Sequence, residues 1–243
     1  MIELAVIGGS GLTELEGLKV TNQQVLETPY GKMSSPITHG IYGGKPIVFL
    51  ARHGIQHTIP PHKINYRANL WALKHIGVKN ILAVAAVGGI EPDLQPGDLV
   101  IPHQIIDYTW GREHTFFDEK LTHVTHIDFT YPYCEELRNK LLLASQNVDF
   151  KVFFQGIYGV TQGPRLETAA EINRMEQDGC DIVGMTGMPE AALARELELC
   201  YATCAVVANE AAGRNNEQIS MAEIEENLID GIDYVRQLLV KIM

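Results

Sequence analysis

Hydrophobic and polar positions follow two different patterns along the chain. Apolar runs, several of them unbroken, recur between segments in which apolar residues return every three or four positions. An unbroken apolar run is typical of a strand that is buried on both faces of a parallel or mixed sheet. The runs predict strands at residues 2–9, 45–51, 80–89, 98–102, 151–160, 181–185 and 202–209.

The segments between the runs carry the period of amphipathic helices, at 62–77, 133–148, 167–179, 189–199 and 221–243. Residues 22–45 combine turn residues with short β-like pieces, which predicts a peripheral hairpin. Residues 107–133 are aromatic and rich in His without periodicity, which predicts a long functional loop. The predicted fold class is α/β, with a single domain over residues 1–243 and a central mixed, twisted β-sheet flanked by helices.

Composition limits the classes of partner. A chain of 243 residues, 46% of them hydrophobic, is long enough for one large core. The net charge of −11 argues against a nucleic-acid partner, which needs clustered Lys and Arg. No apolar run is long enough to span a membrane, and the first residues lack the basic region of a signal peptide. The four cysteines have no C-x-x-C spacing, so a reduced cytoplasmic protein is expected.

Ligands of an open α/β sheet collect at the carboxyl ends of its strands, so the residues after each run are candidates for chemistry. Ser10 follows the first run, among Gly8, Gly9 and Gly11. Glycines let backbone N–H groups crowd around an anion, and Ser10 adds a hydroxyl donor. A simple tight turn is the alternative. The dinucleotide pattern G-x-G-x-x-G is not completed, because position 13 is Thr.

Arg52 and His53 follow the strand predicted at 45–51. A forked guanidinium suits phosphate oxygens, although an internal pair with a carboxylate is an equally ordinary role for Arg52, and His53 fits a core position. Ala86 lies just before Gly88 and Gly89, where the backbone amides are open to close contact. Tight packing of a helix on the sheet would explain the same glycines.

Four further residues stand at strand or helix ends. Glu167 can accept from a ligand N–H or simply favour a helix dipole. Thr186 can donate to an anion or cap a helix, and Met185 can lie against a sugar or base or fill the core. Asn209 ends a strand within VVANEAAG, where it is either a turn former or an amide displayed into a pocket. The sequence shows no acidic metal cluster and no Ser-His-Asp arrangement that competes with this set.

The motifs IGGSGL, ARHG, AAVGG, GPRLE and GMTGMPEAALARE, and the strand ending in Asn209, resemble the trimeric purine nucleoside phosphorylases and their methylthioadenosine phosphorylase relatives. The order and spacing agree from the first strand to the last helix, and RHGIQHTIPPHKINYRANLWALK is especially close to the methylthioadenosine branch. The resemblance implies phosphorolysis: phosphate attacks the anomeric carbon, the purine leaves, and a pentose 1-phosphate forms. It implies no metal or organic cofactor, with inorganic phosphate as co-substrate.

The resemblance also implies roles for named residues. Met185 would lie along the ribose, and His126 would reach the sugar site of a neighbouring subunit, which implies a homotrimer with shared sites. Glycosidic cleavage passes through an oxocarbenium-like state, and phosphate is already an anion, so no strong general base is required. The residues implied to bind phosphate are Ser10, Arg52, His53, Ala86 and Thr186.

The choice of base is implied by four positions. Asn209 falls where 6-oxopurine enzymes carry Asn and the 6-aminopurine branch carries Asp; an amide can donate to O6 and accept from N7–H, whereas a carboxylate would repel O6. Ala211 stands where the methylthioadenosine branch has a second Asp. Glu167 matches a Glu that accepts from N1–H of a 6-oxopurine. Leu166 replaces the stacking Phe of the family, so base stacking is weaker or comes from elsewhere.

The choice of sugar depends on the last helix. Met221 and Ile224 lie three positions apart on one helix face and match the apolar pair that holds a 5'-methylthio group; ordinary purine nucleoside phosphorylases use a His there. A plain core role is the alternative for both. The predicted activity is phosphorolysis of 5'-methylthioinosine to hypoxanthine and 5-methylthioribose 1-phosphate. The alternatives are a methylthioadenosine phosphorylase, a general inosine/guanosine phosphorylase, and a nucleotide-binding module without catalysis.

Overall fold

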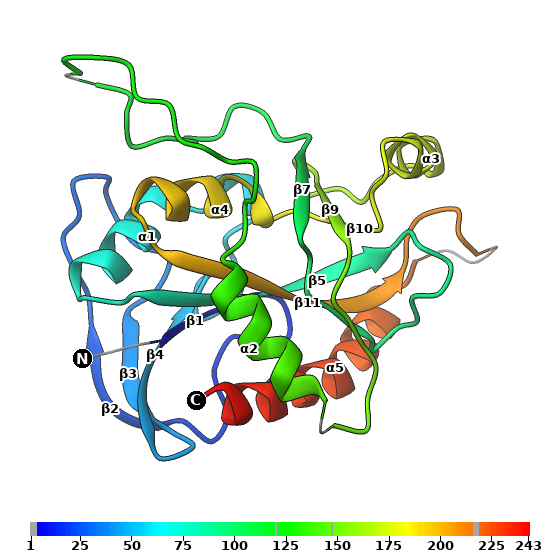
Figure 1. The fold of residues 1–243 in the computed structure, drawn as a ribbon, viewed down its shortest axis with the longest axis horizontal. Coiled ribbons are helices and arrows are strands. Elements are labelled where there is room, and N and C mark those ends of the chain that lie inside the picture. Colours follow the sequence, from blue (N-terminus) through cyan, green and yellow to red (C-terminus); the bar gives the residue numbers. More distant parts are fainter. Residues whose placement is uncertain (1–3, 120, 147, 216–218) are drawn as a thin grey trace.

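One mixed sheet organises the chain (Figure 1). The structure, a computed structural model, describes residues 4–119, 121–146, 148–215 and 219–243. β11 (Cys200–Glu210) pairs with β5 and β6 (Leu99–Val100), and β6 pairs with β8 (Val152–Phe153). The main order of the 11-stranded sheet in these residues is β2 (Lys19–Gln24), β3 (Ile37–Tyr42), β4 (Lys45–Ala51), β1 (Leu4–Gly8), β5 (Asn80–Gly89), β10 (Ile182–Gly184), β9 (Ile157–Val160) and β7 (Gln104–Asp107).

The centre of the sheet is parallel. β1 pairs in parallel with β4 and β5, and β5 pairs in parallel with β11. Antiparallel pairs lie around this centre, between β2, β3 and β4, between β5 and β10, and between β6 and β11. Because the parallel strands run the same way, their carboxyl ends open on one edge of the sheet, where a ligand can collect.

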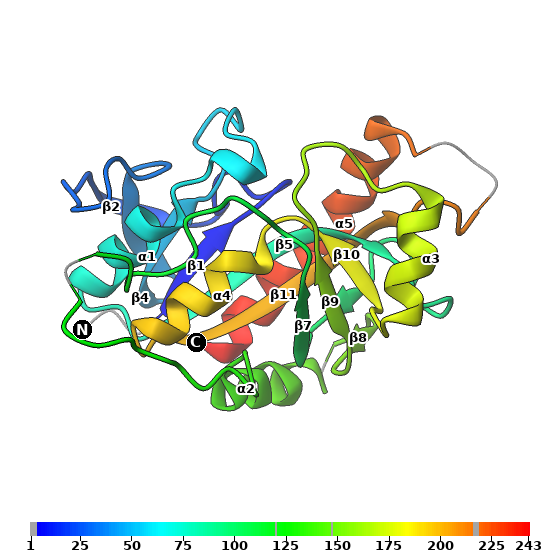
Figure 2. The ribbon, with the colours of Figure 1, turned by 90° about the horizontal axis from the view of Figure 1, so that it is seen from above.

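Both faces of the sheet are covered, which explains the unbroken apolar runs. On one face Ala5 and Ile7 of β1 pack in the same core as α1 (Tyr66–His75) and α4 (Gly187–Glu196). On the other face Leu4 and Val6 pack with α2 (Glu135–Ser145) and α5 (Met221–Ile242). Figures 1 and 2 show these two helix pairs on opposite sides, with α3 (Ala169–Gln177) beside β10. The predicted fold class is confirmed.

Three predicted segments differ in detail. The run at 151–160 forms two strands, because β8 pairs with β6 whereas β9 (Ile157–Val160) pairs with β7 and β10; between them the Phe154 carbonyl accepts from the Arg138 guanidinium. The hairpin predicted at 22–45 begins earlier, at Lys19, and includes β2, whose residues are mostly exposed and so carry no apolar signal. β7 was not predicted, and the irregular loop begins after it at residue 108.

Two of the helix starts follow local side-chain capping. The helix predicted at 62–77 is a short 3-10 turn (Pro61–Lys63) followed by α1, whose N-cap Asn65 accepts from the Ala68 N–H. Thr168 and Glu171 form a capping box that starts α3. α5 begins at Met221, as predicted.

The expectation that all cysteines are reduced is wrong. Cys134 and Cys200 form a disulfide, with their Cα atoms 5.1 Å apart and a sequence separation of 66. It joins the N-cap of α2 to the start of β11. Cys180 and Cys204 are free and buried. Spacing along the chain cannot reveal such a bond, because the sheet topology alone brings the two residues together.

Reduction of this disulfide is expected to lower the free energy of unfolding by about 2–4 kcal/mol, because the bond closes a long loop in the unfolded chain. The measurement is denaturant unfolding with and without reductant. A Cys134→Ala/Cys200→Ala variant is the control, since reductant should not alter its midpoint. Equal midpoints for the oxidised and reduced natural chain would contradict a stabilising role.

Candidate active site

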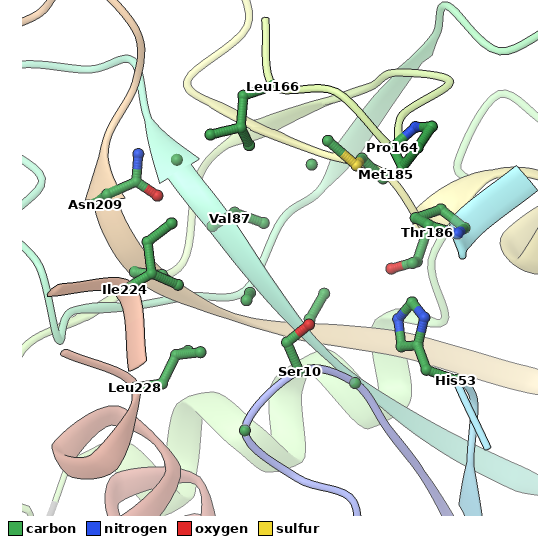
Figure 3. Close-up of a pocket in the computed structure, with 18 of the residues that line it drawn as sticks. Ser10, His53, Val87, Pro164, Leu166, Met185, Thr186, Asn209, Ile224 and Leu228 are labelled. Carbon is green, nitrogen blue, oxygen red and sulfur yellow. The ribbon is translucent and has the colours of Figure 1, made fainter. Parts of the chain in front are cut away.

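A cavity of about 720 Å³ opens at the carboxyl ends of the parallel strands. Figure 3 shows side chains from β5, β11, α5 and the turns after other strands, including Ser10 after β1, around one central space. His126 does not line the cavity: it is exposed on the loop between β7 and α2. The other twelve residues singled out from the sequence all line it: Ser10, Arg52, His53, Ala86, Leu166, Glu167, Met185, Thr186, Asn209, Ala211, Met221 and Ile224.

Ser10, His53 and Thr186 lie together at one end of the cavity (Figure 3). The turn before Ser10 needs glycine, because a Cβ on Gly9 would come within 2.7 Å of the Val84 carbonyl oxygen. Ser10 Oγ lies 3.3 Å from His57 Nε2, and His57 also lines the cavity. Thr186 is the N-cap of α4, and its side chain makes no capping hydrogen bond there. This end therefore offers hydroxyl and backbone donors to an anion.

Arg52 forms the internal ion pair that the sequence left open as an alternative. Its Nε and Nη2 donate to the two oxygens of Glu190 at 2.7 and 2.8 Å, and Nη1 donates to the Val84 carbonyl at 2.9 Å. Tyr201 donates to Glu190 as well. Burial alone would lower the pKa of Arg52, but the charge and hydrogen bonds of Glu190 outweigh it and raise the pKa. A guanidinium has five N–H groups, so two remain for a ligand in the cavity.

His53 is held as a neutral imidazole. Its Nδ1 lies 2.8 Å from the Ile59 carbonyl oxygen, which can only accept, so Nδ1 carries the proton. Burial, then the neighbouring charge of Arg52, lowers the pKa of His53 to about 4. At neutral pH its Nε2 is therefore an acceptor, suited to a protonated phosphate oxygen.

The depressed pKa of His53 makes stability depend on pH. In the unfolded chain His53 binds a proton below about pH 6.5, whereas in the folded chain it binds one only below about pH 4. The contribution of neutral His53 to the free energy of unfolding is fully present above pH 6.5. It is lost as the pH falls towards 4, by roughly 3 kcal/mol. His53→Gln should flatten the slope of unfolding free energy against pH in this window. An unchanged slope would show that His53 titrates normally.

Asn209 lies at a β-bulge, where the pairing of β11 with β5 shifts register between Val207 and Asn209. A bulge re-aims the side chain that follows it, which explains why a strand carries an amide at this end. One N–H of its amide donates to the Glu210 carbonyl at 2.6 Å, leaving a second N–H and the amide oxygen for a ligand. Figure 3 shows Asn209 across the cavity from His53 and Thr186.

Glu167 and Ala211 complete the wall near Asn209. Glu167 accepts from the Thr161 hydroxyl and lies outside the first turn of α3, where Glu171 supplies the helix-capping carboxylate instead. The helix-dipole alternative for Glu167 is therefore unnecessary. Ala211 is buried and places a methyl group, not a carboxylate, in this wall. Leu166 lies at the edge of the cavity, 41% exposed.

Met221 is not a core residue, because 63% of it is exposed while it lines the cavity. Ile224 both lines the cavity and packs against the core under α5. Ile219 and Leu228 extend this apolar wall, and Glu225 joins it. Met185, on the other side, rests on Gly163, whose φ is +60° and where a Cβ would lie 2.4 Å from the Met185 sulfur.

The sequence did not reveal Glu190 and Arg112, which hold other parts of the site in place without a substrate contact of their own. Glu190 is 138 positions from Arg52, and Arg112 lies in an irregular loop, so neither has a local pattern. His57 carried a signal, since it follows Arg52 and His53 within the same ARHGIQHT segment.

In the part of the chain that the structure describes, no group of three or more His, Cys, Asp or Glu side chains could hold a metal ion. Nor does any helix in that part have the length and apolar character to cross a membrane.

Comparison with known proteins gives concordant matches. The family model of the phosphorylase superfamily matches residues 3–243. A protein of Pseudomonas syringae pv. tomato named probable S-methyl-5'-thioinosine phosphorylase is 55% identical over 243 residues, covering 100% of this chain and 99% of that protein. A 6-oxopurine nucleoside phosphorylase of Pyrococcus furiosus is 48% identical over 231 residues, covering 93% of this chain and 86% of that protein.

A solved structure gives the same result for the fold. Methylthioadenosine phosphorylase from Schistosoma mansoni in complex with adenine superposes with a TM-score of 0.94 at 35% identity, covering 100% of this chain and 91% of that chain. With a family match over residues 3–243 and relatives of such identity along nearly its whole length, the chain belongs to the phosphorylase superfamily.

Proposed function

We propose that the chain is a pentosyltransferase that splits S-methyl-5'-thioinosine with phosphate into hypoxanthine and 5-methylthioribose 1-phosphate. One observation carries the proposal: a single cavity joins an amide–carboxylate pair, Asn209 and Glu167, to an apolar wall that contains Met221 and Ile224. The amide–carboxylate pair suits a 6-oxopurine, and the apolar wall suits a methylthio group. The names of close relatives include both substrate types.

In the proposed reaction, phosphate occupies the end of the cavity formed by Ser10, His53 and Thr186, with Ala86 and Arg52 in the same wall. The anion is held beneath the anomeric carbon and needs no base to become a nucleophile. Fixed donors at this end place phosphate for attack on the oxocarbenium-like sugar. Phosphate is the co-substrate, and the proposal includes no metal or organic cofactor.

At the opposite end, the departing purine gains negative charge as the glycosidic bond breaks. The amide of Asn209 donates to O6 and accepts from N7–H, and Glu167 accepts from N1–H. Thr161 already donates to one Glu167 oxygen, which keeps the carboxylate aimed and leaves the other oxygen free. Adenine has no hydrogen on N1, so it would strand Glu167 beside an acceptor, and such mismatches discriminate strongly.

The alternative of a methylthioadenosine phosphorylase has support from the structural relative but meets two obstacles. Ala211 offers no acceptor to an exocyclic amine, and Glu167 lacks a partner on adenine. A general inosine phosphorylase needs a polar contact for the 5'-hydroxyl, and Glu225 is the side chain in the apolar wall that could supply it.

We also propose a homotrimer in which the exposed His126 reaches a neighbour's sugar site.

The proposed reaction is tested by incubating the purified chain with methylthioinosine, with and without phosphate. We expect hypoxanthine release only with phosphate, and one equivalent of 5-methylthioribose 1-phosphate by ³¹P NMR. Release of hypoxanthine with free methylthioribose would identify a hydrolase. Binding without release would identify a nucleoside-binding module.

Met221→His is expected to weaken discrimination for the methylthio group by about 10–100-fold, because a polar ring replaces an apolar contact of a few methylenes. The measurement is the ratio of kcat/KM for methylthioinosine to that for inosine. Ile229→His is the matched control, since Ile229 is equally exposed on α5 but does not line the cavity. An unchanged ratio in Met221→His would place the 5' pocket elsewhere.

A further inference from the structure

Arg112 is a buried guanidinium that is held by neutral acceptors. It is 8% exposed, and in the described part of the chain no carboxylate forms a salt bridge with it. Its nitrogens donate at 2.6–3.3 Å to the carbonyl oxygens of Met185, Met188, Thr161 and Gln162, to Gln162 Oε1 and to the Tyr66 hydroxyl. A buried charge satisfied only by neutral dipoles is costly to maintain, which indicates a positioning role.

The four carbonyls belong to two turns that form one side of the cavity. Thr161 and Gln162 begin the turn after β9, which continues to Glu167. Met185 belongs to the turn between β10 and α4, and Met188, whose φ and ψ are not helical, continues that turn within the first residues of α4. One guanidinium therefore joins the two turns, although it does not itself line the cavity.

Each turn carries a side chain that faces the substrate. Met185 lies in the cavity wall, and its sulfur packs on Gly163 of the other turn. Thr161, whose carbonyl Arg112 holds, donates its hydroxyl to Glu167. The network thus runs from Arg112 to the ribose side through Met185 and to the base side through Thr161 and Glu167.

We propose that Arg112 is a positioning residue that fixes the distance between Met185 and Glu167, and so the geometry in which the nucleoside is held. The inference rests on the proposed function of this cavity. The role needs the planar fork of a guanidinium, because its donors spread over two turns; a Lys ammonium supplies three donors from one point. Ser10 and His53 lie outside this network, whereas Thr186 lies inside it, between Met185 and Met188. Phosphate binding should therefore depend on Arg112 much less than nucleoside binding does.

The test compares Arg112→Lys and Arg112→Ala with the natural chain, using whichever of methylthioinosine, methylthioadenosine or inosine the natural chain turns over fastest. We expect kcat/KM for the nucleoside to fall roughly 100-fold in both variants, as for a misplacement of about 1 Å. The KM for phosphate should change much less than kcat/KM for the nucleoside, because Ser10 and His53 lie outside the network. Millimolar guanidinium should restore part of the activity of Arg112→Ala.

Arg67→Ala is the matched control, because Arg67 pairs with Glu113 and Asp118 of the same loop and contacts neither turn. It should keep its nucleoside kcat/KM within a few fold and gain nothing from guanidinium. Equal losses for nucleoside and phosphate without guanidinium rescue, or a nucleoside kcat/KM that is unchanged in Arg112→Lys, would overturn the inference. A natural chain that prefers another nucleoside would overturn the proposed substrate but leave this test intact.

Discussion

Asn209→Asp is expected to reduce kcat/KM for methylthioinosine by about 10²–10⁴-fold, and this is the largest change in specificity expected from one substitution. The bulge in β11 aims this side chain into the cavity. A carboxylate there would face O6 of the purine, and two acceptors without a proton between them repel each other. The ratio of methylthioadenosine to methylthioinosine turnover should rise, without full conversion, because Glu167 and Ala211 still disfavour adenine.

Asn227→Asp is the matched control for this change. Asn227 also carries its amide beside β11, where it donates to the Ala208 carbonyl at 2.9 Å, but it does not line the cavity. Asn227→Asp should alter stability and leave the ratio of the two substrates unchanged. If Asn209→Asp also leaves that ratio unchanged, Asn209 does not select the base.

Glu190→Ala is expected to have the largest effect on stability, about 3–5 kcal/mol of unfolding free energy. Glu190 is fully buried, and its removal leaves the 1% exposed Arg52 without a charge partner and Tyr201 without an acceptor. Removing one member of a buried ion pair is costly because the other charge stays desolvated. Denaturant unfolding at neutral pH measures the loss.

Two further variants test whether the stability loss comes from the unpaired charge of Arg52. Glu136→Ala removes the exposed pair with Lys140 and should change stability by less than about 1 kcal/mol. Arg52→Met/Glu190→Leu should recover much of the stability lost in Glu190→Ala, because no unpaired charge remains, and yet should bind phosphate poorly. A Glu190→Ala chain as stable as the natural one would mean that water reaches Arg52.

The fold was largely predictable because its signals are local. β1 and β5 send alternate residues to two cores, so both read as unbroken apolar runs. The helices carry an apolar stripe, and two of them, α1 and α3, start at side chains that cap them, Asn65 and Thr168. The start of β2 was placed three residues too late because its residues are mostly exposed, and β7 was missed because its four residues, mostly half-buried, are too few to show a pattern.

The candidate site was predictable where its polar side chains lie at or just after the end of a predicted strand. Ser10, Arg52 and Asn209 directly follow or end buried runs, and the parallel centre of the sheet brings them to one cavity. What holds them in place was not predictable. The partners of Arg52 and Cys134 are chosen by tertiary contact, from far along the chain, and no spacing rule anticipates either pair.

The central claim is that one cavity selects a 6-oxopurine at one end and a methylthio group at the other. The most direct measurement is kcat/KM for methylthioinosine, methylthioadenosine and inosine with saturating phosphate, on one preparation. We expect kcat/KM for methylthioinosine to exceed that for each of the others by at least about 10-fold. A preference for methylthioadenosine would contradict the roles of Asn209 and Glu167, and a preference for inosine would contradict those of Met221 and Ile224.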